Sequence, residues 1–213
     1  MSLNALQEKI ADKTAKLAII GLGYVGLPVA CLFAEAGFDV IGVDIQAERV
    51  AQINAGCNED YLPGILLPEG IRASTDPQEA LAGADIVVLA VPSQTLRANL
   101  SGWTLPETAA VVSLMKGVEL GTTKRMSEVI EEVGEVDPSR IVVVSGPNLA
   151  KEIAVKQPAA SVVACRDEAA AERVAAACAA PYFRPYTGTD VVGTEIAGAV
   201  KNVIALAVGM AEG

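Results

Sequence analysis

A glycine-rich segment at residues 21–26 has the spacing GxGxxG and lies between an expected strand and an expected helix. Lacking a Cβ atom, Gly21 allows a tight turn, Gly23 lets the backbone approach a pyrophosphate, and Gly26 permits close helix packing. The pyrophosphate would lie at the helix N-terminus, where unpaired N–H groups and the positive end of the helix dipole face it. The pattern therefore predicts a dinucleotide-binding loop.

Asp44 supports this prediction because it ends the next expected strand, 18 residues after Gly26. A carboxylate there can accept hydrogen bonds from the adenosine ribose. The same charge would repel a 2′-phosphate, so NAD is the expected cofactor and NADP is disfavoured. Tyr24 and Val25 belong to the same loop and are counted with the cofactor site. The alternative is a glycine turn followed by an aspartate that only caps a helix.

Polar residues also follow two later strands. Lys116, in SLMKGVE, emerges at the carboxyl end of an expected buried strand, where ligands of open parallel sheets bind. Gly146 and Asn148, in SGPNLA, follow another strand, and their N–H groups and amide could orient a polar substrate. A solvated turn lysine and an asparagine helix cap explain these residues equally well.

Lys201 and Asn202 form the last polar pair and lie in a segment that is otherwise apolar, EIAGAVKNVIALA. Burial disfavours a charged ammonium, so a lysine in such a helix can act as an acid or base near neutral pH. The alternative is a lysine whose stem covers apolar surface while its ammonium reaches water.

Composition excludes several other chemistries. The chain has 213 residues and no histidine, which removes Ser-His-Asp and Cys-His hydrolases, His-type zinc sites and dehydrogenases with a histidine relay. The four cysteines form no CxxC pair and are expected to be buried in a reducing compartment. No metal site is therefore expected.

Charge and hydropathy limit the partners and the location. The net charge is −10, which repels nucleic acid and anionic membrane surfaces. The apolar stretch from 17 to 43 is interrupted by glycine, proline and acidic residues, so it is not expected to span a membrane. We expect a soluble protein of the cytoplasm with a small-molecule substrate.

The elements that position these residues alternate between strands and helices, which predicts crossover units and a mostly parallel sheet. The fold class is therefore α/β, a Rossmann-like doubly wound sheet in a domain over 1–188 that includes a leader helix within 1–16. Expected strands are 17–20, 39–43, 85–91, 110–114, 140–144 and 161–165. Expected helices are 25–36, 46–55, 77–81, 122–132, 148–153 and 168–179.

The segment 189–213 has a different character and predicts the first helix of an all-helical domain that is truncated at Gly213. Apolar residues lie on nearly every face of this helix, so it should need a partner. We therefore expect self-association, with a homodimer as the simplest form, or fraying of the last turns.

Residues 58–213 resemble the bacterial NAD(P)-dependent glycerol-3-phosphate dehydrogenases. The resemblance runs through YLPGILLP, VPSQTLRANL, SLMKGVELGT, SGPNLAKEIA, QPAASVVAC and EIAGAVKNVIALA, in that order. It implies reversible hydride transfer between NAD and sn-glycerol 3-phosphate, giving dihydroxyacetone phosphate for glycerophospholipid precursors. It also implies roles for individual residues: Lys201 as proton acceptor, Lys116 in contact with substrate and nicotinamide, Gly146, Asn148 and Asn202 at the substrate, and Ala150 at the cofactor.

Residues 1–57 resemble instead the cofactor-binding start of UDP-sugar 6-dehydrogenases, notably those for UDP-N-acetylhexosamines, so a junction is expected near 52–60. Those enzymes need a nucleophilic cysteine in a GxCFPKD-like segment, which no cysteine of this chain has. The glycerol-phosphate family usually has an aromatic residue at the position of Val25, and its helical domain continues with an aspartate and a Ser-Arg-Asn segment that hold the substrate. The alternatives are thus a UDP-sugar dehydrogenase-type NAD-binding domain, or a cofactor-binding fragment without turnover.

Overall fold

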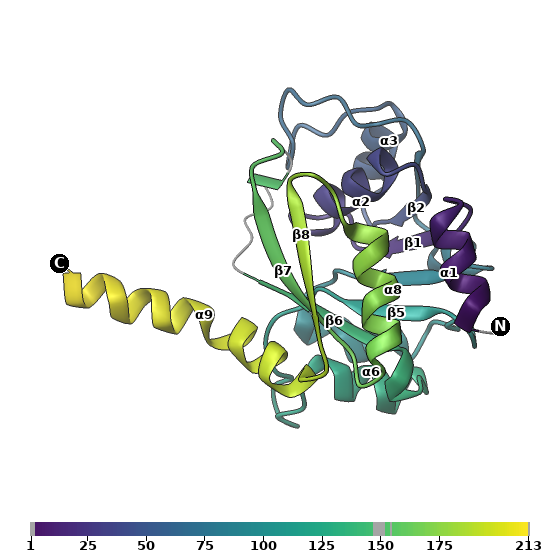
Figure 1. The fold of residues 1–213 in the computed structure, drawn as a ribbon. Coiled ribbons are helices and arrows are strands. Elements are labelled where there is room, and N and C mark those ends of the chain that lie inside the picture. Colours follow the sequence, from purple (N-terminus) through teal and green to yellow (C-terminus); the bar gives the residue numbers. More distant parts are fainter. Residues whose placement is uncertain (1–2, 147–151, 154, 213) are drawn as a thin grey trace.

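A computed structural model describes residues 3–146, 152–153 and 155–212. One eight-stranded sheet in the order β3-β2-β1-β4-β5-β6-β7-β8 forms the centre, with helices on both faces (Figure 1). The strands are β1 Lys16–Ile20, β2 Asp39–Val43, β3 Ile71–Ser74, β4 Ile86–Leu89, β5 Ala110–Ser113, β6 Ile141–Ser145, β7 Ala159–Ala164 and β8 Phe183–Gly188. Neighbouring strands are parallel except for β6 and β7, which pair antiparallel. The predicted α/β fold class is confirmed.

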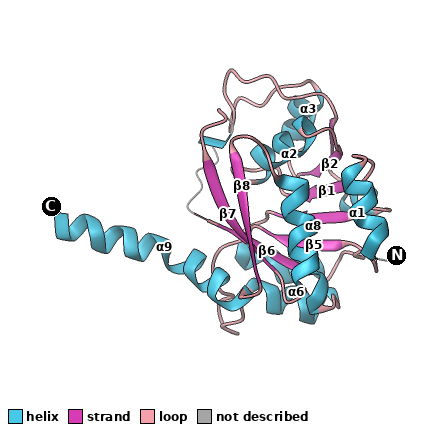
Figure 2. Cartoon of the chain, in the orientation of Figure 1, coloured by secondary structure: helices cyan, strands magenta, loops and turns pink. Residues whose placement is uncertain are grey.

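The helices alternate with the strands along the chain (Figure 2). The α-helices of the described residues are α1 Leu3–Ala11, α2 Gly26–Glu35, α3 Ala47–Asn54, α4 Pro77–Leu81, α5 Leu96–Leu100, α6 Met126–Gly134, α8 Glu168–Cys178 and α9 Val191–Glu212. Two short 3₁₀ helices, η1 Ser93–Thr95 and η2 Pro138–Arg140, lie between them.

The sheet is buried on both faces because its strands present apolar residues alternately to two cores. Leu17 and Ile19 of β1 belong to the core under α1, α2 and α8, whereas Ala18 and Ile20 belong to the core under α4, α5 and α6. This follows from the two-residue period of a strand. Every residue of β4 and β5 is buried, as the continuous apolar runs in the sequence predict.

Several elements differ from the sequence-based expectation. β3, β8 and α5 are short or polar and were not predicted: β3 is an edge strand of sequence IRAS, and β8 contains Arg184 and Pro185. The helix expected from 122 begins only at Met126, because residues 118–125 first form a tight reversal with a bridge between Val118 and Arg125. The helix expected at 148–153 lies mostly outside the described residues.

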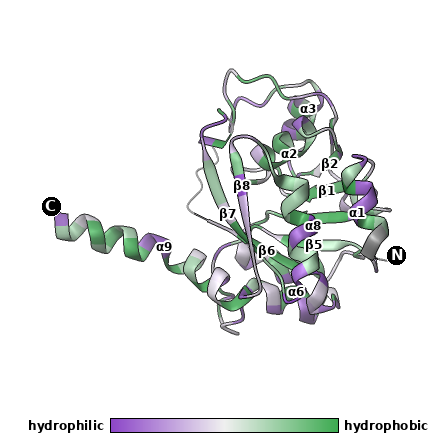
Figure 3. Ribbon diagram, viewed as in Figure 1, coloured by the Kyte–Doolittle hydropathy of each residue, from purple (hydrophilic) through white to green (hydrophobic). Residues whose placement is uncertain are grey.

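α9 packs only its first turns against β6 and β7, and its remainder extends away from the sheet (Figure 1). The extended part is largely apolar (Figure 3). Its exposed apolar side chains are Val192, Ile196, Val200, Val203, Ile204, Leu206, Val208 and Met210. Among the described helices α9 is the one whose length and composition would suit a membrane span, a test that a core helix of a soluble protein passes as well.

α1 covers the sheet through an ion pair at the amino end of β4. The buried Asp85 accepts hydrogen bonds from Lys9 Nζ at 2.7 Å and from the Lys16 N–H at 3.0 Å. Figure 1 shows α1 beside α8, the helix on which it packs. The expected leader helix is therefore part of the folded unit.

Asp85→Ala should lower the free energy of unfolding by roughly 1–3 kcal/mol, because it leaves a backbone N–H and an ammonium without their shared acceptor. Lys9→Met is the matched control and should cost at most about 1 kcal/mol, since the lysine side chain is 36% exposed. Urea unfolding of both variants measures the difference. Equal destabilisation by the two changes would contradict this assignment.

Candidate functional site

The candidate site lies along the edge of the sheet where the parallel strands end. The glycine loop follows β1, Asp44 follows β2, Lys116 follows β5 and Gly146 follows β6. Because β2, β1, β4, β5 and β6 are parallel neighbours, their carboxyl ends meet at this edge, which is where open α/β sheets bind ligands.

Two glycines of the loop are required by the protein's own packing. Gly21 has φ +100°, and a Cβ atom there would lie 2.7 Å from the Ala90 carbonyl oxygen. A Cβ atom on Gly26, the first residue of α2, would collide with the Gly21 carbonyl oxygen. The loop therefore folds tightly against the end of β4.

Gly23 differs from these two because the protein leaves the space beside it open. Among the described residues other than its chain neighbours, only the Tyr61 hydroxyl oxygen would lie within 4 Å of a Cβ at Gly23, at 3.9 Å. Tyr24 and Val25 are exposed, and Val25, the N-cap residue of α2, provides no side-chain hydrogen bond to the helix. An approaching anion would thus meet open backbone at the helix N-terminus.

Asp44 is buried and already has two protein partners. Its Oδ1 accepts the Gln46 N–H at 3.0 Å, and its Oδ2 accepts Arg49 Nη1 at 2.7 Å. The Arg49 guanidinium lies over the Tyr61 ring, 4.8 Å from its centroid, and its Nε is buried with no hydrogen-bond partner among the described residues. Burial lowers the pKa of Arg49, but the hydrogen bond and charge of Asp44, together with the charges of Tyr61 and Asp60, raise it above its ordinary value. The sequence pattern points to the carboxylate alone and does not reveal this cation.

Lys116 reaches across the ends of two strands. Its Nζ donates to the Gly146 carbonyl oxygen at 3.1 Å, which links the loops after β5 and β6. Although the side chain is exposed, partial desolvation lowers the pKa of Lys116, and the positive charge of Lys201 lowers it further.

α9 brings Lys201 to the same place. Gly198, one helical turn earlier, lies so close to the strand ends that a Cβ atom there would be 2.5 Å from Ser145 Oγ and 3.8 Å from Lys116 Cγ. Lys201 is half-buried, and Asn202 beside it is exposed. The structure thus brings Lys116, Gly146 and Lys201 together, whereas Asn148 and Ala150 lie outside the described residues.

Two sets of polar contacts hold the loop that carries Lys116. Gln94 accepts the Leu120 N–H at 2.9 Å and donates to the Val118 carbonyl at 2.8 Å, as a neighbouring strand would. Arg97 donates to both carboxylate oxygens of Glu119, at 2.8 and 2.9 Å. Hydrogen bonds from Arg97 and Thr122 lower the pKa of Glu119 to about 2, so this carboxylate stays ionised at neutral pH.

A third cluster, formed by Arg125, Ser127 and Glu195, fixes the start of α9. Glu195 is 6% exposed, and its carboxylate accepts hydrogen bonds from both other residues. Sequence reasoning missed this cluster because 68 residues separate Ser127 from Glu195. The one available signal was a glutamate within an apolar helical segment.

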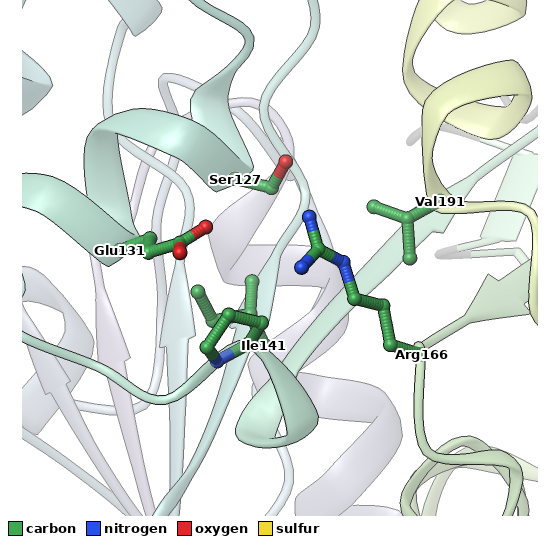
Figure 4. Close-up of a pocket in the computed structure, with 6 residues that line it drawn as sticks. Ser127, Glu131, Ile141, Arg166 and Val191 are labelled. Carbon is green, nitrogen blue, oxygen red and sulfur yellow. The ribbon is translucent and has the colours of Figure 1, made fainter.

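Two pockets of the described surface are not lined by the glycine loop or by Lys116. The pocket in Figure 4 has a volume of only about 10 Å³ and is lined by Ser127, Glu131, Pro138, Ile141, Arg166 and Val191. That volume is at the lower limit for one water molecule. A second cavity, of about 220 Å³, lies by Asp85 and Arg140 at the amino ends of the strands. Among the described residues, no group of acidic residues and cysteines could hold a metal ion.

Two family models match the chain. The N-terminal model of NAD-dependent glycerol-3-phosphate dehydrogenase matches residues 16–171, and the C-terminal model matches residues 190–213. The first match runs without a break across 52–60, where the sequence predicts a junction.

Individual relatives agree with the family match. Glycerol-3-phosphate dehydrogenase (NAD(P)+) from Streptomyces avermitilis is 57% identical over 201 residues, which are 93% of this chain and 60% of the relative. The chain therefore spans about 60% of the length of this relative. The crystal structure of glycerol-3-phosphate dehydrogenase from Coxiella burnetii is 28% identical with a TM-score of 0.84, over 93% of this chain and 61% of that one.

The UDP-sugar dehydrogenase resemblance also has a structural counterpart. The UDP-D-ManNAc dehydrogenase of Pyrococcus horikoshii superposes with a TM-score of 0.68 at 21% identity, over 89% of this chain and 50% of that one. At that identity the likeness extends to the fold alone.

Proposed function

This chain belongs to the NAD-dependent glycerol-3-phosphate dehydrogenase family, and on that premise we propose that it carries the cofactor site and the proton-transferring lysine of such an enzyme. The reaction is reversible hydride transfer between NAD and C2 of sn-glycerol 3-phosphate, with dihydroxyacetone phosphate as the oxidised product. The observation that carries the proposal is the meeting of Lys116 and Lys201 at the sheet edge that also holds the glycine loop.

The residues of the loop fit a dinucleotide. The open backbone at Gly23 and the uncapped start of α2 suit a pyrophosphate, while Gly21 and Gly26 keep the loop close to β4. Asp44 retains lone pairs for ribose hydroxyls beyond its bonds to Gln46 and Arg49. NAD, when bound, supplies the hydride acceptor at its nicotinamide. Tyr24, Val25 and Ala150 are proposed contacts of the same cofactor.

The two lysines have different roles in the proposed reaction. Removing a hydride from C2 requires loss of the hydroxyl proton, which a neutral amine at Lys201 would accept. An ammonium at Lys116 would stabilise negative charge on the C2 oxygen. Partial burial lowers the pKa of Lys116, and the positive charge of Lys201 lowers it further, so the two amino groups interact electrostatically. Gly146, Asn148 and Asn202 are proposed to orient the substrate.

The chain's cysteines support this chemistry over that of a UDP-sugar 6-dehydrogenase, which needs a reactive thiolate. Burial raises the pKa of Cys31 and of Cys178 to about 12, and it raises the pKa of Cys165 as well. Such thiols are inert nucleophiles near neutral pH. The four cysteines are free, in keeping with a proposed location in the reducing cytoplasm.

We further propose that 1–188 and 189–213 belong to different domains, the second of them helical. The exposed apolar side chains of α9 favour burial against other helices or a second copy of the chain. A homodimer remains a prediction.

Lys201→Ala should lower kcat for oxidation of glycerol 3-phosphate roughly 10²- to 10⁴-fold, the usual contribution of a general base, and leave the Kd for NAD unchanged. NADH formation is followed with the chain itself and with the chain extended by the remaining segment of the Streptomyces avermitilis relative. Full activity of the variant in the extended protein contradicts the proposed role. NAD binding without turnover in both forms would instead favour a cofactor-binding fragment.

Gly23→Ala should weaken NAD binding about tenfold or more, because a methyl group occupies the space left for the pyrophosphate. The free energy of unfolding should change by no more than about 0.5 kcal/mol, since the protein leaves that space empty. Gly26→Ala is the contrasting control and should destabilise the fold by about 1–3 kcal/mol through overpacking. Calorimetric titration and thermal unfolding separate the two effects. Unchanged NAD affinity in the Gly23 variant would exclude this loop.

The wild-type chain should bind NAD more tightly than NADP, because a 2′-phosphate beside Asp44 costs on the order of a few kcal/mol. Asp44→Ala should weaken NAD and reduce the discrimination, since Arg49 then faces the phosphate without its carboxylate partner. Arg49→Met in the Asp44→Ala background should restore the preference for NAD. Equal or tighter NADP binding by the wild type is the result that contradicts this assignment.

A further inference from the structure

Glu195 is a buried carboxylate in the second turn of α9. Its Oε1 accepts the Ser127 backbone N–H at 2.8 Å, and its Oε2 accepts the Ser127 hydroxyl and Arg125 Nη1, each at 2.6 Å. Ser127 is the second residue of α6, so the carboxylate also lies at the positive end of that helix dipole. Charge-assisted bonds of this kind are short and geometrically specific. The first turns of α9 are therefore fixed to the start of α6.

The same cluster is connected to Lys116 along the chain. Residues 118–125 reverse tightly, with a bridge between Val118 and Arg125 and a hydrogen bond from the Glu119 N–H to the Lys124 carbonyl at 2.8 Å. Lys116 lies two residues before this reversal, and Ser127 lies two residues after it. The loop that carries Lys116 and the cluster of Arg125, Ser127 and Glu195, which anchors α9, thus form one structural unit.

A second contact fixes how α9 leaves that anchor. Gly198, one turn after Glu195, packs against Ser145 at the end of β6. Lys201 follows Gly198 by one further turn, and its positive charge acts on Lys116. On the other side of Glu195, Val191 is buried with Val143 of β6 and Ala164 of β7. The bonds of Glu195 add a directional restraint to this apolar packing and so fix the register of α9.

We propose that Glu195 is a positioning residue that sets the separation of Lys116 and Lys201 by fixing α9 to Ser127 and Arg125. The consequence for turnover rests on the function proposed above. The consequence for the geometry of the two lysines does not, and it can be measured without substrate.

The test is the pKa of Lys116, followed by NMR of lysine side chains in wild type, Glu195→Gln, Lys201→Met and the double variant. Glutamine keeps the size of the side chain but removes its charge, and its amide group turns one acceptor into a donor that faces Ser127 and Arg125. Glu195→Gln should raise the pKa of Lys116 towards 10.5, as Lys201→Met does by removing the neighbouring charge. In the Lys201→Met background, Glu195→Gln should produce no further rise.

Glu128→Gln is the matched control. Glu128 pairs with the same arginine, at 3.1 Å from Arg125 Nη2, but it lies on α6 itself and bonds to no residue in the described part of α9. This variant should leave the pKa of Lys116 at its wild-type value. Amide spectra and circular dichroism establish that each variant is folded, and Glu195→Asp, which keeps the charge on a shorter side chain, replaces Glu195→Gln where that variant does not fold.

An unchanged pKa of Lys116 in folded Glu195→Gln, with a raised pKa in Lys201→Met, overturns the proposal. A change in the pKa of Lys116 that is equal in the presence and absence of Lys201 overturns it too: an equal fall would mean that the charge of Glu195 acts directly on Lys116, and an equal rise would mean an effect that does not pass through Lys201. In the extended, active protein Glu195→Gln should lower kcat by up to about 100-fold, with little change in the KM for NAD. If no form turns over glycerol 3-phosphate, the proposed function fails while the pKa comparison still decides the role of Glu195.

Discussion

The parallel alignment of five neighbouring strands is the constraint on which the site depends. β2, β1, β4, β5 and β6 run in one direction, so the segments that follow them must all start from one edge of the sheet. The strands can lie in this order because both faces are covered by helices, which bury every residue of β4 and β5. Residues nearly 100 positions apart, such as Gly21 and Lys116, thereby share an edge without any direct bond between their loops.

Placing two lysines side by side opposes folding, and the surrounding polar contacts offset that cost. The loop of Lys116 is held by Gln94 and by the ion pair of Arg97 with Glu119, while α9 is held by Glu195. None of these contacts touches either ammonium in the structure. These contacts thus hold the loop and the helix in place without using the lysine nitrogens, which stay available for chemistry.

The sequence predicts those parts of the structure that depend on local pattern. The apolar runs of β1, β2, β4, β5 and β6 identify them to within a residue or two at most ends, and the glycine spacing identifies the loop after β1. β3 and β8 could not be predicted, because edge strands are partly exposed and their polar residues hide the period. Arg49 beside Asp44, and Glu195 beside Ser127, depend on tertiary contacts that no spacing in the sequence reveals.

Six helical steps separate Lys201 from Glu195, and together they fix the distance and the angle between these two residues on α9. Each residue of an α-helix advances the chain by about 1.5 Å and turns it by about 100°. One inserted or deleted residue in this interval would therefore swing the lysine to another face of α9 while the anchor stayed in place. The exposed turns at 101–102 and 107–108 carry no such register and tolerate changes of length more readily, whereas Trp103 and Leu105 between them pack against the core. Insertions and deletions in proteins that derive from this chain should therefore be absent from the start of α9 and concentrated in exposed turns without a fixed register.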